Sequence, residues 1–100
     1  MSVKVVITSE GDSIDSMVST VSARSSYFLI FEENELVKMI KNPFKVGGGV
    51  GFAVASLLAD EKVEIVISQN FGDKMLFALE EKNIKWKKVG AISVKEALDI

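Results

Sequence analysis

The feature of this sequence that most constrains its fold is a glycine cluster placed directly before an unbroken apolar stretch. Glycine fills four of the five positions 47–51, and the residues from Phe52 to Ala59 contain no helix breaker. A stretch that is apolar on nearly all sides is typical of a helix covered on most of its surface. Glycines ahead of such a helix permit positive φ angles and leave its first N–H groups unobstructed. The segment therefore predicts a buried helix whose start suits an anion. On the plainer interpretation, the glycines only form a bend that lets the helix pack tightly.

The other apolar runs predict the remaining elements. Strands are expected at 3–8, 27–32, 36–41, 63–68 and 84–89, and helices from the glycine cluster to Asp60, at 73–82 and at 94–99. The short link at 33–35 indicates an antiparallel hairpin. The order of the elements predicts one α/β domain over residues 1–100, with three layers and a five-stranded mixed sheet that combines the hairpin with α/β crossovers.

A hydroxyl-rich segment joins the first two strands. The segment runs from Thr8 to Ser26 and contains eight serine and threonine residues after Thr8. We expect a long loop with one helical turn near 19–24. A loop of this length in a small domain is functional or mobile. Arg24, at its end, is the single arginine among twelve basic residues. Its planar fork suits a carboxylate or phosphate, whereas the alternative is a surface ion pair with Asp12 or Asp15.

Composition excludes several classes of function. The chain has no cysteine and no histidine. It therefore cannot build the usual zinc, haem or iron–sulfur site alone, nor a Ser-His or Cys-His nucleophile pair. We assign no catalytic residue and no metal ligand. The net charge of −2 argues against a nucleic-acid partner. Neither a membrane span nor a signal peptide is visible, so we expect a cytoplasmic protein without a membrane partner.

The glycine cluster does not match the standard nucleotide-binding patterns. No Lys-Ser or Lys-Thr follows it, as the phosphate-binding loop of NTPases requires. The dinucleotide pattern Gly-x-Gly-x-x-Gly/Ala also fails, because its last position is Phe52 when counted from Gly47 and Val54 when counted from Gly49. Nucleotide binding of either kind is not expected.

In open α/β sheets, ligands bind beyond the carboxyl ends of the strands. The serine-rich loop and the turn at 70–72 both leave from that edge. Whether the glycine cluster shares the edge depends on the direction of the third strand, which the sequence leaves open. The candidate ligand-binding residues are Ser9, Ser19, Arg24, Gly48, Gly49, Gly51, Asn70 and Gly72.

Several blocks of the sequence, in their order and spacing, resemble the dinitrogenase iron–molybdenum cofactor biosynthesis family. These blocks are 15–19 with Arg24 and 27–30, Asn42-Pro43, 48–51 leading to 57–59, 70–72 with 77–79, and 93–98. The resemblance covers nearly the whole chain and implies a ribonuclease H-like fold.

The resemblance also implies a function. It is that of a non-catalytic carrier that holds an anionic metal–sulfur cluster, its precursor or another small anion. The cofactor is unknown; by resemblance it is an iron–sulfur or iron–molybdenum cluster, and the partners are metallocluster-assembly proteins. The family often has His-Phe-Gly before its arginine, where this chain has Val21-Ser22-Ala23. Without that histidine, we expect contacts from backbone N–H groups, hydroxyls and Arg24 to an anion. A monomer or weak homodimer is expected.

Two other interpretations stay open. The chain could be a protein-interaction module without a ligand, docking through its hairpin or through the edge at 84–89. It could also be a metal-dependent hydrolase that uses Glu10 and Asp12, although both residues fit solvated positions in a turn.

Overall fold

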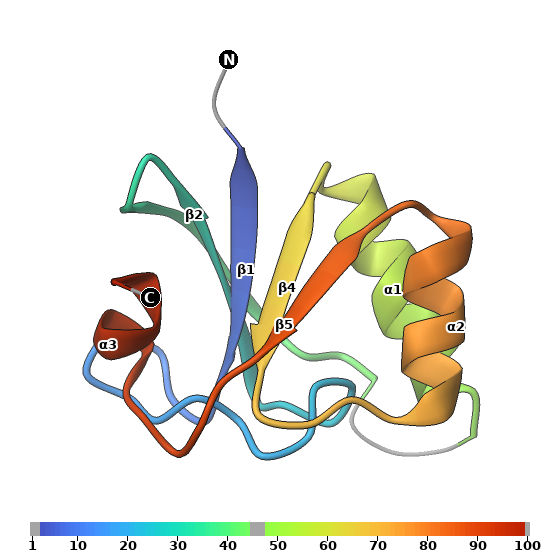
Figure 1. Cartoon of the computed structure of the whole chain (residues 1–100), viewed down its shortest axis with the longest axis horizontal. Helices are drawn as coiled ribbons and strands as arrows, with labels where there is room; N and C mark the ends of the chain where they lie inside the picture. The colour runs from blue at the N-terminus through green and yellow to red at the C-terminus, as the bar shows by residue number, and fades with distance from the viewer. Residues whose placement is uncertain (1–2, 45–47, 100) are drawn as a thin grey trace.

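A computed structural model describes residues 3–44 and 48–99 of the chain. Strands and helices follow one another in the predicted order (Figure 1). They are β1 (Lys4–Ser9), β2 (Tyr27–Glu32), β3 (Glu35–Lys41), α1 (Val50–Asp60), β4 (Ile65–Ser68), α2 (Asp73–Glu81), β5 (Lys85–Lys88) and α3 (Val94–Leu98). Within these residues, no helix is long and apolar enough to cross a membrane.

The strands form one sheet in the order β3-β2-β1-β4-β5. Strand β2 runs antiparallel to both β1 and β3, whereas β4 is parallel to β1 and β5 is parallel to β4. Because β3 is antiparallel to β2, it runs in the same direction as β1. The register agrees, since Tyr27 lies opposite Ser9 on one side and Lys41 on the other. Strands β1, β3 and β4 therefore end at one edge, here called the carboxyl edge, and α1 begins there.

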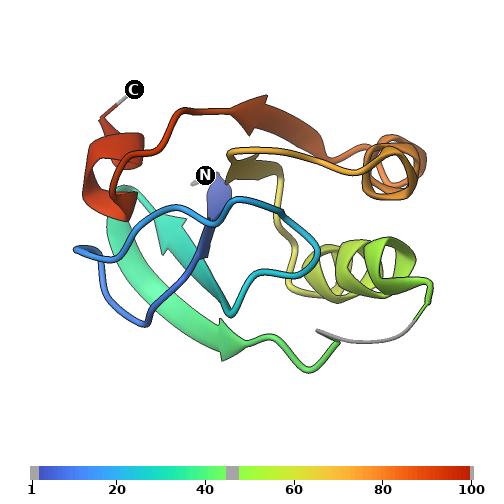
Figure 2. The same ribbon diagram turned by 90° about the horizontal axis from the view of Figure 1, so that it is seen from below.

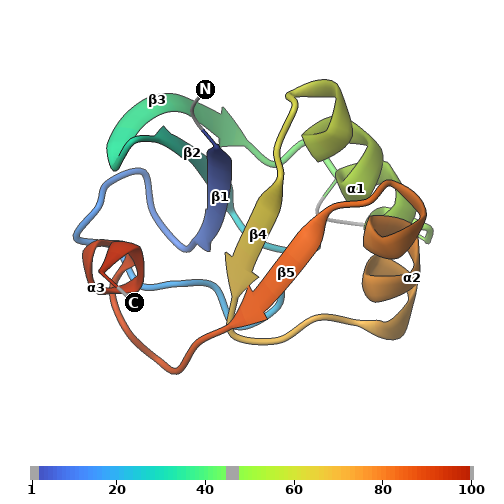
Figure 3. The ribbon, with the colours of Figure 1, turned by 45° about the horizontal axis from the view of Figure 1, so that its top comes forward.

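Alternation along the strands creates two cores. Phe28 and Ile30 face one side of the sheet, where they pack with the apolar sides of α1 and α2. Leu29 and Phe31 face the other side, where Val94 of α3 joins them. Helices α1 and α2 lie together on one side of the sheet and α3 lies on the other (Figures 1 and 3). The predicted three-layer α/β domain with a mixed five-stranded sheet is confirmed.

The ends of the elements follow local chemistry. Glu33 and Asn34 both have positive φ angles, as the two-residue hairpin turn requires. Asn83, with a φ of 58°, follows the end of α2. Ser93 and Glu96 form the predicted capping box at the start of α3.

The serine-rich segment differs from the prediction in one respect: it has no helical turn at 19–24. Single β-bridges connect it to three parts of the fold, pairing Val18 with Ser9, Met17 with Ser93 and Val21 with Asn70. The backbone of this segment bonds to distant strands and turns, because serine side chains compete with helical hydrogen bonds and weaken the helical alternative. Figure 2, seen from below, shows this segment crossing the end of the sheet.

Candidate functional site

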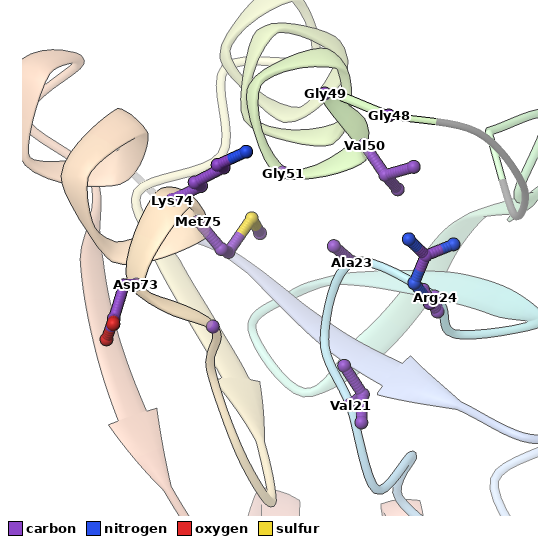
Figure 4. Close-up of a pocket in the computed structure, with 11 residues that line it drawn as sticks. Val21, Ala23, Arg24, Gly48, Gly49, Val50, Gly51, Asp73, Lys74 and Met75 are labelled. Carbon is purple, nitrogen blue, oxygen red and sulfur yellow. The ribbon is translucent and has the colours of Figure 1, made fainter.

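A cavity of about 340 Å³ lies beyond the carboxyl edge of the sheet, between α1, α2 and the serine-rich segment (Figure 4). Three segments that are distant in sequence form its walls. The lining residues are Val21, Ala23, Arg24, Gly48, Gly49, Val50, Gly51, Gly72, Asp73, Lys74 and Met75. The glycine cluster and the serine-rich loop thus share one edge, which the sequence had left open.

Helix α1 begins at this cavity without a side-chain cap. Its N-cap is Gly49, which has a φ of 70° and makes no side-chain cap hydrogen bond. The first bond inside the helix runs from the Ala53 N–H to the Gly49 carbonyl. The amides of the preceding turn have no partner within the helix, so the positive end of its dipole faces the cavity.

Helix α2 begins at the same cavity. Its N-cap, Gly72, also lacks a side-chain cap hydrogen bond, and its first helical bond joins the Leu76 N–H to the Gly72 carbonyl. Gly51 allows the two helices to approach at this end. A Cβ atom placed on Gly51 would lie 2.9 Å from the backbone nitrogen of Met75 and 3.2 Å from its Cα. Two helix N-termini therefore converge on one cavity.

Charged side chains add to the positive potential of the helix ends. Arg24 and Lys74 are both exposed and line the cavity together with one carboxylate, Asp73. In Figure 4 the guanidinium of Arg24 and the ammonium of Lys74 extend toward the start of α1, whereas the carboxylate of Asp73 points away. The cavity can hold a small anion by N–H donors and two cations, while Val21 and Val50 supply apolar contact.

The turn that carries Arg24 is fixed by a buried amide. Asn42 follows β3 directly, and its Nδ2 donates to the carbonyl oxygens of Ala23 (2.9 Å) and Ser25 (2.8 Å). Its Oδ1 accepts a hydrogen bond from the Phe44 N–H at 2.8 Å. Asn42 thus joins the end of the hairpin to the turn that positions Arg24.

Five of the predicted binding residues line the cavity: Arg24, Gly48, Gly49, Gly51 and Gly72. Gly47, the first glycine of the cluster, lies outside the described residues.

The other three predicted residues lie elsewhere. Ser9 and Ser19 are buried, and each is hydrogen-bonded to Ser25, Ser9 through its backbone N–H and Ser19 through its hydroxyl. Asn70 is exposed, and its Nδ2 donates to the carbonyl oxygen of Thr20 at 3.1 Å. These residues hold the serine-rich segment against the sheet and do not line the cavity.

Several lining residues were not predicted. They are Val21, Ala23, Val50, Asp73, Lys74 and Met75. Lys74 is the informative omission, because the amphipathic pattern of α2 marks it only as a water-facing residue. The sequence does offer one signal for Lys74, which is its place in the first turn of the helix that follows Gly72. A basic residue at that place adds positive charge to the end of the helix that is already positive.

The carboxylates considered for hydrolysis lie outside the cavity lining. Glu10 and Asp12 belong to the loop after β1, where the Glu10 N–H donates to the Met17 carbonyl. Among residues 3–44 and 48–99, no three acidic, histidine or cysteine side chains gather as a metal site would require.

Comparisons with known proteins give one consistent result. A model of the family described as "Dinitrogenase iron-molybdenum cofactor" matches residues 1–99. An NMR structure of a Thermotoga protein, provisionally described as NifB and placed in the DUF35 family, is 32% identical, with a TM-score of 0.85 over 97% of this chain and 84% of that one. The apo form of the orange protein from Desulfovibrio gigas shares the fold at 21% identity, with a TM-score of 0.89 over 96% of this chain and 83% of that one. A comparison with curated proteins found no match.

Proposed function

We propose a function for this chain from one premise: the chain belongs to the dinitrogenase iron-molybdenum cofactor family. The resemblance noted in the sequence is thereby confirmed, and this family membership supports a role in cofactor biosynthesis. Within that frame we infer a carrier without catalytic activity. Its cargo is a small anion, in the first instance an anionic metal–sulfur cluster or a precursor of one, and its partners are the proteins that assemble such clusters.

One observation carries this proposal: two helix N-termini, Arg24 and Lys74 meet at a single cavity. A helix start presents unpaired N–H donors and a partial positive charge, and each cation strengthens the same field. A fully formed anion can bind there without any change in its own bonds. The arrangement supplies binding and orientation.

The residues of the cavity favour outer-sphere binding over coordination. The chain has no cysteine or histidine, and among the described lining residues the sulfur belongs to Met75, which is 1% exposed. A metal–sulfur cargo would therefore arrive with its own ligand set complete. Guanidinium, ammonium and amide donors would then contact its outer sulfur or oxygen atoms.

The test is a titration of the isotope-labelled protein with sodium sulfate and sodium molybdate, followed by amide chemical shifts. We expect the largest shifts at Gly48–Gly51 and Gly72–Met75, and weak, saturable binding. The double substitution Arg24→Ala with Lys74→Ala should reduce the affinity at least about tenfold, because each charge-assisted contact contributes about 1.5–3 kcal/mol.

Two controls make this test specific. Lys87→Ala removes an exposed lysine of β5 that does not line the cavity, and it should leave the affinity unchanged. Sodium chloride at equal ionic strength separates binding from screening. Shifts spread evenly over all the surface lysines, or equal affinity in the double variant, would refute the proposed site.

A further inference from the structure

An exposed aromatic pair lies on the helices that begin at the cavity. Phe52 of α1 and Phe77 of α2 are 42% and 56% exposed. Their rings meet edge to face, with centroids 6.2 Å apart and planes at 81°. Because α1 and α2 lie side by side (Figure 2), this aromatic pair spans the seam between them. It forms an apolar surface that the two helices share and that faces solvent.

Helix geometry places the aromatic pair next to the cavity. Phe52 follows Gly49 by three residues and Phe77 follows Lys74 by three, and both Gly49 and Lys74 line the cavity. Residues three apart in a helix are neighbours on one face, and helical side chains lean toward the N-terminal end of the helix. Both rings therefore lean toward the turns that form the cavity wall, and the aromatic pair adjoins the cavity on its α1 and α2 side.

The charges around the aromatic pair differ at its two ends. At the cavity end lie Arg24 and Lys74, whose ammonium extends toward the start of α1 (Figure 4). At the other end lie Glu80 and Glu81, which are exposed and follow Phe77 by three and four residues. A negative group is attracted at the first end and repelled at the second. A ligand that covers the rings is thus apolar over them and negative only where it enters the cavity.

We propose that the cargo is an amphipathic anion, with a negative head in the cavity and an apolar arm that lies across Phe52 and Phe77. This inference rests on the proposed carrier function and names the chemistry of its cargo. The ligand set that the cargo brings with it includes an organic group on the side of α1 and α2. Such a group removes apolar ring surface from water and contacts the rings directly. A purely inorganic anion fills the head position alone and leaves both rings in water.

Two sulfonates with the same head and different arms test the proposal. Methanesulfonate and naphthalenesulfonate are titrated into the isotope-labelled protein, and the chemical shifts of its amides and phenylalanine rings are followed. Naphthalenesulfonate should bind at least about tenfold more tightly, an advantage that the removal of roughly 55 Å² of apolar surface from water supplies. The double substitution Phe52→Ala with Phe77→Ala should reduce the ratio of the two affinities at least about fivefold, because most of that surface is lost.

The matched control is Leu36→Ala. Leu36 of β3 is 42% exposed, as Phe52 is, and it does not line the cavity, so its loss should leave the ratio unchanged. Circular dichroism of each variant checks that the fold is intact. A ratio near one in the original chain would overturn the proposal and favour a protein partner for the aromatic pair. So would naphthalenesulfonate that shifts the two rings without shifting the amides of Gly72–Lys74, because apolar contact alone would then explain its binding.

The same titrations separate a failure of this inference from a failure of the proposed function. If the ratio is near one and methanesulfonate still binds saturably at the amides of Gly48–Gly51, the anion site is retained and only the apolar arm is refuted. If neither sulfonate shifts those amides, the proposed anion site fails, and the inference fails with it.

Discussion

Replacing Gly51 with alanine should both destabilise the protein and weaken anion binding. The added Cβ would lie 2.9 Å from the backbone nitrogen of Met75, 3.2 Å from its Cα and 3.3 Å from the carbonyl carbon of Lys74. All three atoms belong to the main chain of α2, so no side-chain rotation can relieve the contact. The start of α2 must therefore move away from α1, and the donors that converge on the cavity then separate.

The magnitude follows from two opposing terms. Overpacking in a well-packed interior costs about 1–3 kcal/mol. Alanine recovers up to about 1 kcal/mol, because it is a better helix former than glycine. We expect a net loss of about 1–2 kcal/mol in the free energy of unfolding, measured by urea denaturation. For a domain of this size, that loss lowers the melting temperature by at least about 4 °C.

Two other glycines of the cluster serve as controls. A Cβ on Gly48 meets no atom of the described residues within 4 Å, so alanine there should change the stability by no more than about 0.5 kcal/mol. Gly49 also has open space, but its φ is 70°, so alanine there costs about 1–2 kcal/mol of backbone strain without displacing α2. Only the change at Gly51 should shift the amide resonances of α2. Original stability combined with unchanged resonances at Met75 would refute this account of the helix contact.

Two further substitutions test the supports of the site. Asn42→Ala removes the amide that donates to the carbonyls of Ala23 and Ser25. We expect the free energy of unfolding, measured by urea denaturation, to fall by about 1–3 kcal/mol. Sulfate binding should also weaken, because the turn that carries the arginine of the cavity is no longer held. Ser25→Ala removes the acceptor used by the Ser9 amide and the Ser19 hydroxyl, so the free energy of unfolding should fall by about 2 kcal/mol. A fall of less than about 0.5 kcal/mol would show that these buried groups find other partners.

The fold could be predicted from the sequence because its signals are local. Runs such as Tyr27–Glu32 are dense in β-branched and aromatic residues, and the short link that follows favours an antiparallel hairpin. The direction of β3 relative to β1 was not predictable in the same way. It depends on which strand lies beside which, and such pairing is a property of the whole sheet.

The candidate site was predicted in part for the same reason. Glycines at a helix start and an isolated arginine have distinctive local chemistry, and Gly49 and Arg24 do line the cavity. Serine hydroxyls have no such distinction, because Ser19 can bind a ligand or satisfy a buried neighbour with equal chemistry. Lys74 looked like an ordinary surface residue until the packing of α2 against α1 brought it to the cavity.

The walls of the cavity come from positions 21–24, 48–51 and 72–75, which meet only when the chain is folded. Under the proposed carrier function, an unfolded chain would offer the cargo nothing comparable, so occupancy would shift the folding equilibrium by mass action. At a free cargo concentration one hundred times the dissociation constant, the gain is about 2.7 kcal/mol, which makes global unfolding about a hundredfold rarer. Loaded molecules would then outlast empty ones wherever proteases act on unfolded chains, and the supply of cargo would set how much of the protein persists.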